Sequence, residues 1–177
     1  TVAFSTVAEG VGLCVTAASA HEHGYRVNLL GVGSGEWHSM RRFRALREFV
    51  RGLPPDALVL HIDAYDVLFN APPHALVTHM LQSGKRILFS AEKGCCAPKD
   101  ALIKFENRCD KGWLVPDVDT AMPWLNAGVW MGFAKELNAF FDACHEEDVE
   151  TTAWARQDLR RKSYLNWMDQ TLFCEMF

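Results

Sequence analysis

Residues 56–69 read DALVLHIDAYDVLF, and within them a strongly apolar run gives way to two aspartates, Asp63 and Asp66. The first part, DALVLHID (56–63), is a short apolar run of the kind that predicts a buried strand. Ligands of open α/β sheets bind outside the carboxyl ends of the strands. The two aspartates are therefore the first candidates for a functional site.

Strands and helices are predicted to alternate on both sides of this segment. An amphipathic helix with Met40, Phe43, Leu46 and Val50 on one face precedes it, closed by Gly52. Parallel strands need crossovers that helices supply, so the alternation predicts an α/β fold with a mostly parallel central sheet and helices on both faces. The expected strands are 1–8, 25–33, 56–63 and 85–92, and the expected helices are 9–24, 38–52 and 71–84.

The second half of the chain is expected to hold an irregular excursion and further regular elements. Residues 93–123 show little sustained period and predict a loop over the sheet. Residues 124–134 have strand composition interrupted by glycines, and residues 135–147 and 166–177 predict helices. Because neither a linker nor a repeat stands out, we expect one domain over residues 1–177.

Composition excludes several classes of protein. The 177 residues carry a net charge of −4, which argues against a broad nucleic-acid footprint. No apolar run approaches the roughly 18 residues that predict a membrane span. Six cysteines show no zinc-binding spacing. Cys95 and Cys109 can bracket a disulfide-closed loop, and buried free thiols explain the cysteines about as well.

Asp63 and Asp66 can share a ligand only if the chain bends after Asp63, because residues three apart on a straight strand point to opposite faces. Two converging carboxylates repel each other, and a divalent cation between them removes that penalty. Oxygen ligands suit Mn²⁺ or Mg²⁺, which retain positions for water and substrate phosphates. The alternative is that these aspartates cap a turn or the next helix.

Three other polar positions have both a functional and a structural interpretation. The amide of Asn126 can bond a ligand hydroxyl, although asparagine before a small residue and glycine is more often turn chemistry. Asp169, followed by Gln170, can reach a substrate hydroxyl or belong to a solvated helix face. His61 lies within an apolar strand, where a core histidine is more common than a ligand.

Several segments in order carry a resemblance to a known family: TVAF, LLGVGSGEW, LVLHIDAYDVLF, GKRILFSAE, WLNAGVWMGFA and MDQTLFCEMF. Together they resemble the N-terminal glycosyltransferase domain of the multifunctional procollagen lysyl hydroxylases. The resemblance implies a GT-A-type nucleotide-sugar-binding fold and use of UDP-glucose or UDP-galactose with Mn²⁺. It also implies an acceptor such as hydroxylysine or galactosyl-hydroxylysine of collagen-like protein, and residence in the endoplasmic reticulum lumen or secretory pathway.

The resemblance also implies roles for particular residues. Asp63 and Asp66 match the family's metal-binding pair. Asp169 and Asn126 match positions that face the donor sugar or the acceptor. Asp169 is the candidate to orient or deprotonate the acceptor hydroxyl. Positions matched to nucleotide-sugar binding are Val2, Ala3, Phe4, Trp37, Arg42, Asp63, Ala64 and Tyr65, with Tyr65 able to stack on uracil.

Departures from the family pattern define the alternatives. Phe4 stands where the family usually has threonine, and the acidic run before Gln170 is reduced to Asp169. The family's third metal ligand, a histidine in an HGNGPTK-like motif, has no match in these residues. The expected function is metal-dependent hexosyl transfer from a UDP-sugar to a hydroxyl. The alternatives are a catalytically degenerate module that binds UDP-sugar or collagen peptide, and a nucleotidyltransferase or sugar-phosphate enzyme on the same fold.

Overall fold

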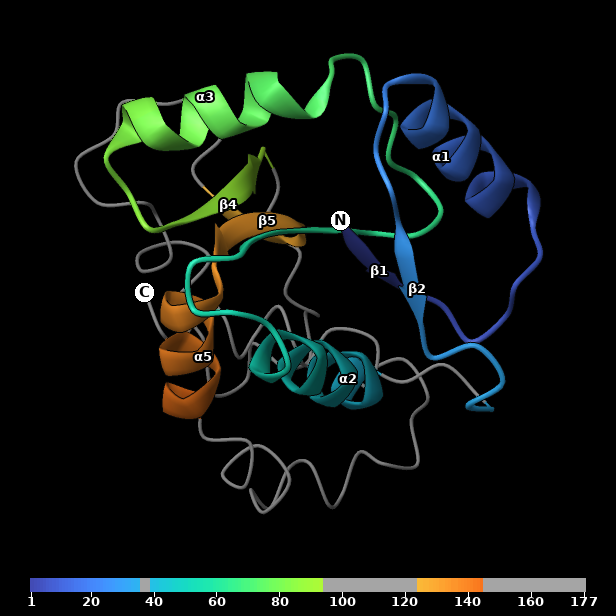
Figure 1. Ribbon diagram of the computed structural model, residues 1–177. Coiled ribbons are helices and arrows are strands. Elements are labelled where there is room, and N and C mark those ends of the chain that lie inside the picture. Colours follow the sequence, from blue (N-terminus) through green and yellow to red (C-terminus); the bar gives the residue numbers. More distant parts are fainter. Residues whose placement is uncertain (36–38, 94–123, 145–177) are drawn as a thin grey trace.

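The computed structural model describes residues 1–35, 39–93 and 124–144, which form a five-stranded mixed sheet (Figure 1). Strand β1 pairs in parallel with β2 and β3, whereas β5 pairs antiparallel with β3 and β4. Four strands thus share one direction, as expected for a mostly parallel sheet. The strands are β1 (Val2–Phe4), β2 (Asn28–Leu30), β3 (Leu58–Ile62), β4 (Ile87–Glu92) and β5 (Trp124–Phe133), in the order β2-β1-β3-β5-β4.

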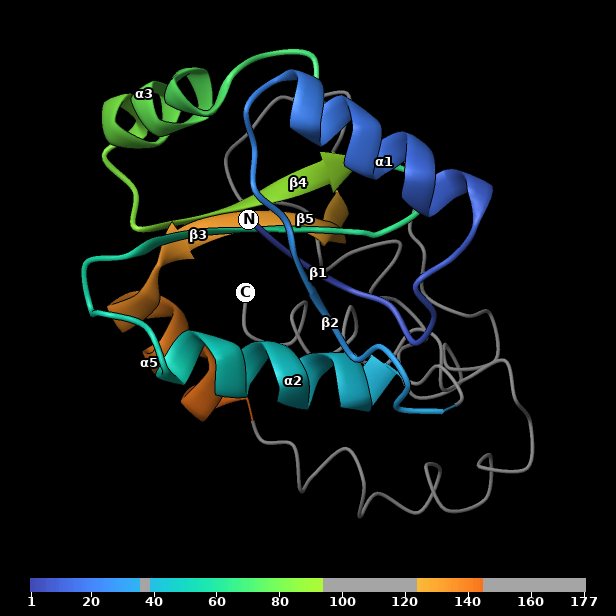
Figure 2. The same ribbon diagram turned by 45° about the vertical axis from the view of Figure 1, so that its right-hand side comes forward.

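Helices cover both faces of the sheet, which confirms the predicted layers (Figure 2). Helices α1 and α3 lie on one face, and α2 and α5 lie on the other. No helix among the described residues is long and apolar enough to cross a membrane. The helices are α1 (Val11–Glu22), α2 (Ser39–Arg51), α3 (Pro73–Ser83) and α5 (Ala134–Ala143).

The α2–α5 face holds the larger core. Phe43 of α2 meets Phe141 of α5 edge to face, with ring centroids 5.3 Å apart, and Trp130 of β5 packs on Phe141 at 5.8 Å. Leu46 and Val50 are buried with them, as the predicted apolar face of the helix requires. Each such side chain contributes about 1.5–3 kcal/mol through burial, so this contact fixes α2 against the sheet.

Local signals set the helix ends close to their predicted positions. Helix α3 begins at Pro73, which needs no backbone donor there, and ends before Gly84, whose φ of 65° is left-handed. Helix α2 ends at Arg51, just before Gly52. The predicted elements 9–24, 38–52 and 71–84 are therefore confirmed with slightly shorter bounds.

The direction of β5 matters most for function. Because β5 runs against β3 and β4, its first residues lie at the same edge as the carboxyl ends of those two strands. Ser90 of β4 pairs with Asn126, and Ile62 of β3 pairs with Val129. The predicted helix 166–177, the excursion 93–123 beyond residue 93 and the Cys95–Cys109 loop lie outside the described residues.

Candidate functional site

The candidate site lies where β1, β3 and β4 end and β5 begins. Ala3 of β1 pairs with Ile62 of β3, so Phe4 and Asp63 leave the sheet side by side. The backbone N–H of Asp63 donates to the carbonyl oxygen of Gly128 at 2.7 Å. Four strands that are distant in sequence therefore meet near Asp63.

The chain bends directly after Asp63, as a shared site requires. Strand β3 ends at Ile62, and the backbone turns through residues 64–66. Asp66 is exposed at the end of this bend, and it does not cap α3, whose N-cap is Pro72. The helix-capping alternative is therefore wrong for Asp66.

Arg42 forms a close ion pair at the site. Its Nη1 donates to Oδ1 of Asp63 at 2.6 Å, and the two side chains are 12% and 36% exposed. A charge-assisted hydrogen bond that is partly shielded from water is stronger than an exposed ion pair. The family resemblance implies a nucleotide-binding role for Arg42, and the structure shows that it bonds the carboxylate proposed for the metal.

Asn126 is oriented by a hydrogen bond from the backbone two residues on and by Ser90 of β4. Its Oδ1 accepts the backbone N–H of Gly128 at 2.8 Å and lies 3.1 Å from Oγ of Ser90. The turn-chemistry interpretation of this asparagine is thus confirmed. Because Oδ1 is occupied by these donors, the amide N–H₂ is the group that can donate to a ligand.

Gly128 is a residue whose importance the sequence did not reveal. A Cβ at this position would lie 2.3 Å from Oδ2 of Asp63 and 3.0 Å from Oδ1 of Asn126. These two oxygens therefore flank one point, and any larger side chain would fill the space between them. The glycine in WLNAGVW was visible as a break in the strand, but its neighbour Asp63 was not.

Tyr65 is held by a hydrogen bond and remains accessible. Its hydroxyl contacts Oγ of the fully buried Ser5, whose own proton goes to the carbonyl oxygen of Val7 at 2.6 Å. Tyr65 must then be the donor to Ser5. The residue is 43% exposed, which leaves ring surface for stacking. Ser5 was not predicted, although a serine at a strand end was a usable signal.

The other predicted nucleotide-binding positions are mostly core residues. Val2 packs in the core between the sheet and α2, and Ala3 and Ala64 pack on the opposite face with α1. The ring of Phe4 lies against Gly31, where a Cβ would come within 2.3 Å of Cε2. Contacts of Val2, Ala3 and Ala64 with a ligand would thus come from their backbone. Trp37 and Asp169 lie outside the described residues.

His61 lies beneath the site and is buried. Its ring stacks on Trp130 with centroids 4.8 Å apart, and within the described residues neither ring nitrogen has a hydrogen-bond partner. Burial, assisted by the charge of Arg42, holds the pKa of His61 well below its usual value. His61 is therefore a neutral core side chain, as the structural interpretation predicts.

Asp63 and Asp66 carry oxygen donors of the kind that Mg²⁺ and Mn²⁺ bind. Nowhere in residues 1–35, 39–93 and 124–144 do three or more His, Cys, Asp or Glu side chains gather as a metal cluster. Mg²⁺ and Mn²⁺ are commonly bound through one or two carboxylates plus phosphates. The space that Gly128 leaves beside Asp63 and the exposed Asp66 suit that kind of site.

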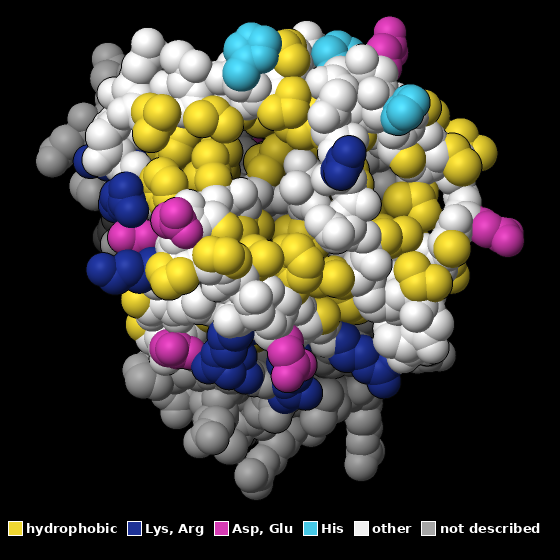
Figure 3. All heavy atoms as spheres, viewed as in Figure 1, with side chains coloured by type: hydrophobic (Ala, Val, Ile, Leu, Met, Phe, Trp, Pro, Cys, Tyr) yellow, Lys and Arg dark blue, Asp and Glu magenta, His cyan; other side chains and the backbone are white. Residues whose placement is uncertain are grey.

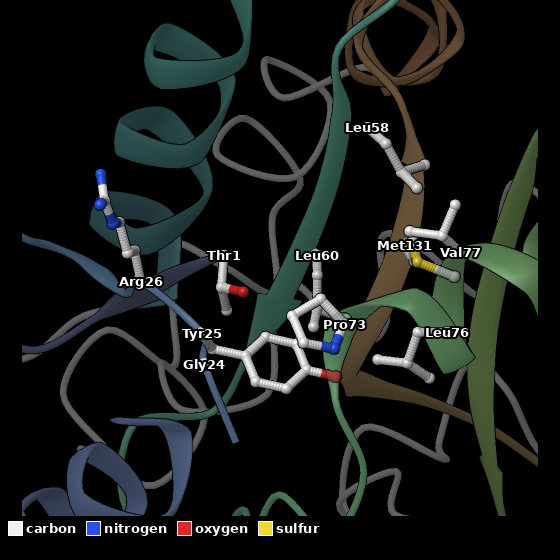
Figure 4. A pocket seen from close by; sticks show the side chains of 10 residues that line it. All are labelled: Thr1, Gly24, Tyr25, Arg26, Leu58, Leu60, Pro73, Leu76, Val77 and Met131. Atoms are coloured by element: carbon white, nitrogen blue, oxygen red, sulfur yellow. The ribbon is translucent and has the colours of Figure 1, made fainter. Parts of the chain in front are cut away.

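Basic side chains, apolar side chains and a pocket occupy other parts of the surface. Lys and Arg side chains gather over α2, and apolar side chains gather over the sheet between α1 and α3 (Figure 3). A pocket of about 240 Å³ lies there, lined by Thr1, Leu60 and Leu76 among others (Figure 4). It lies near the amino ends of β1 and β3, where Thr1 and Leu58 line it. Of the described residues that line it, Arg26 alone has a charged side chain and none has a carboxylate, so the pocket is separate from the candidate site.

The mixed, mostly parallel α/β sheet with helices on both faces is consistent with a GT-A-like domain. A family model described as the PLOD GT domain matches residues 1–157. The chain therefore belongs to the family of PLOD glycosyltransferase domains.

Its relatives are much longer proteins. The human multifunctional procollagen lysine hydroxylase and glycosyltransferase LH3 is 31% identical over 142 residues, which cover 74% of this chain and 18% of the relative. The Drosophila melanogaster procollagen-lysine,2-oxoglutarate 5-dioxygenase is 29% identical over 146 residues, covering 76% and 18%. The Caenorhabditis elegans multifunctional procollagen lysine hydroxylase and glycosyltransferase is 28% identical over 102 residues, covering 54% and 12%. The chain thus spans less than a fifth of these relatives.

Proposed function

We propose that this domain transfers a hexose, glucose or galactose, from a UDP-sugar to a hydroxyl group of a hydroxylysine-containing or glycosylated collagen-like acceptor. The observation that carries the proposal is the meeting of Asp63 and Asn126 at Gly128, at the carboxyl edge, with Arg42 bonded to Asp63. Membership of a glycosyltransferase-domain family and the glycosyltransferase names of two relatives support the reaction class.

The residues of the edge have separate tasks in this mechanism. Tyr65, fixed by Ser5, offers an accessible ring on which the uracil base stacks. Arg42 supplies positive charge to the diphosphate as its bond to the anomeric carbon breaks. Asn126 donates its amide to a sugar hydroxyl, and Asp169 orients or deprotonates the acceptor hydroxyl.

Asp63 and Asp66 would hold a divalent cation, Mn²⁺ or Mg²⁺. When bound, such a cation supplies Lewis-acid neutralisation of the leaving diphosphate. The hydrogen bond from the Asp63 N–H to the carbonyl oxygen of Gly128 fixes the backbone of Asp63, and the bond from Arg42 orients its carboxylate before any ligand arrives. A collagen-type acceptor places the reaction in the secretory pathway, in the endoplasmic reticulum lumen.

Product analysis tests the proposal. The chain is incubated with Mn²⁺, UDP-glucose or UDP-galactose, and peptides that carry hydroxylysine, galactosyl-hydroxylysine or lysine as a control. We expect a mass gain of one hexose on a hydroxyl-bearing peptide, and its loss in Asp63→Asn. Release of UDP without peptide modification would assign a hydrolytic activity instead, and release of sugar 1-phosphate would assign a nucleotidyl-transfer activity. UDP-sugar binding without turnover would identify a binding module.

A further inference from the structure

The ion pair between Arg42 and Asp63 links helix α2 to the end of β3. Arg42 lies in the first turn of α2, which is anchored to the sheet through Phe43 and Leu46. The 2.6 Å bond is shielded, because the guanidinium side chain is only 12% exposed. The contact is therefore a stable feature of the nucleotide-free domain.

The same carboxylate is required by the cation of the proposed function. A guanidinium and a divalent cation are both positive, so their simultaneous approach to one carboxylate is opposed by repulsion at low local dielectric. An anion beside them relieves that repulsion. The diphosphate of a UDP-sugar is such an anion, and guanidinium groups bind phosphate oxygens well.

We propose that Arg42 is a counter-ion that moves between two partners: it neutralises Asp63 in the ligand-free domain and passes to the diphosphate when the cation takes the carboxylate. Cation and nucleotide binding are then coupled through Arg42. By linkage, each ligand strengthens the other by the same factor. This inference rests on the proposed function, since it needs a cation at Asp63 and a nucleotide beside it.

The chain offers a matched control on the same helix. Arg51, the last residue of α2, pairs with Asp142 of α5 at 2.5 Å, but here the two side chains are 52% and 57% exposed. Arg51→Gln removes the same charge from the same helix as Arg42→Gln. Any effect of net charge alone appears in both variants.

The test measures binding of Mn²⁺ without turnover. Free Mn²⁺ is followed by electron paramagnetic resonance during titration of the whole chain, with and without UDP, in wild type, Arg42→Gln, Arg42→Lys and Arg51→Gln. Without UDP, we expect Arg42→Gln to bind Mn²⁺ about tenfold more tightly than wild type, because a charged hydrogen bond no longer competes. Arg51→Gln should match wild type.

The effect of UDP on Mn²⁺ affinity gives the second readout. UDP should strengthen Mn²⁺ binding by a larger factor in wild type than in Arg42→Gln. Arg42→Lys keeps the charge, so without UDP its dissociation constant for Mn²⁺ should stay within about threefold of the wild-type value. Circular dichroism checks that each variant is folded. If Arg42→Gln does not fold, Arg42→Lys and wild type still decide: tenfold tighter Mn²⁺ binding by the lysine variant contradicts the counter-ion role.

Two failures can be distinguished. If wild type binds Mn²⁺ and UDP but Arg42→Gln binds Mn²⁺ no more tightly, or keeps the full coupling, Arg42 is not the counter-ion and the proposed function stands. If wild type binds neither ligand, alone or together, the proposed function falls and the inference falls with it.

Discussion

The substitution Gly128→Ala is predicted to disable the site while leaving the fold intact. Gly128 sits between the side chains of Asp63 and Asn126, and its φ is not in the left-handed region, so alanine meets no backbone strain there. The added methyl group would lie 2.3 Å from Oδ2 of Asp63. The effect of the substitution is therefore on the carboxylate rather than on the strand.

The size of the effect follows from the distances. Ordinary contacts of a Cβ begin at 3.4 Å, so the Asp63 carboxylate must move by about 1 Å. A misplacement of about 1 Å can lower a catalytic rate about a hundredfold. Overpacking costs about 1–3 kcal/mol, and the low end applies because Asp63 lies just past the end of β3 and its side chain is partly exposed. We expect kcat/KM to fall about a hundredfold and stability to fall by about 1 kcal/mol.

The assay compares this variant with Gly132→Ala on the same strand. A Cβ at position 132 would lie 3.0 Å from Cγ of Leu137 and 3.1 Å from Cγ1 of Ile87, which are core atoms away from the site. Hexosyl transfer and urea unfolding are measured for both. Gly132→Ala should lose stability but keep its kcat/KM. Equal activity of Gly128→Ala and wild type, or an equal loss in both variants, would refute the proposed geometry.

Two further predictions concern the buried polar groups and thiols. His61→Phe keeps a ring on Trp130 and removes two nitrogens that have no partners among the described residues. Urea unfolding at pH 7 should therefore show a free energy of unfolding that is unchanged or raised by about 1 kcal/mol. A loss above about 2 kcal/mol would reveal a hydrogen bond to His61. Burial raises the pKa of the Cys144 thiol to about 12. As the pH rises, the unfolded chain therefore loses this proton before the folded chain does, and the folded state becomes less stable. Between pH 8 and 10 the free energy of unfolding should fall by about 1.4 kcal/mol more in wild type than in Cys144→Ala. Equal pH slopes in the two proteins would contradict that shift.

Much of the layer arrangement could be predicted because it depends on local periodicity. The arginine-rich helix was predicted from Phe43, Leu46 and Val50, and the structure buries all three. Helix α3 was predicted from the proline at its start and Gly84 after its end. Such signals lie within one element, so a single sequence contains them.

The contacts of the site could be predicted only in part, because they join distant segments. Asp63 was found from its place after an apolar strand, but its bond to Arg42 depends on how α2 docks on the sheet. The importance of Gly128 depends on β5 running antiparallel to β3, and strand composition does not specify direction. The tie between Ser5 and Tyr65 spans 60 residues and has no pattern within either segment.

The most direct test of the site is calorimetric titration of UDP into the whole chain with Mn²⁺, with EDTA in place of Mn²⁺, and with Asp63→Asn. This substitution keeps the shape of the side chain and removes the charge that holds a cation. We predict that UDP binds the wild type in Mn²⁺, and that binding is lost or strongly weakened both in EDTA and in the variant. UDP binding of equal strength in all three conditions, or no binding in any, would contradict a metal–nucleotide site at Asp63.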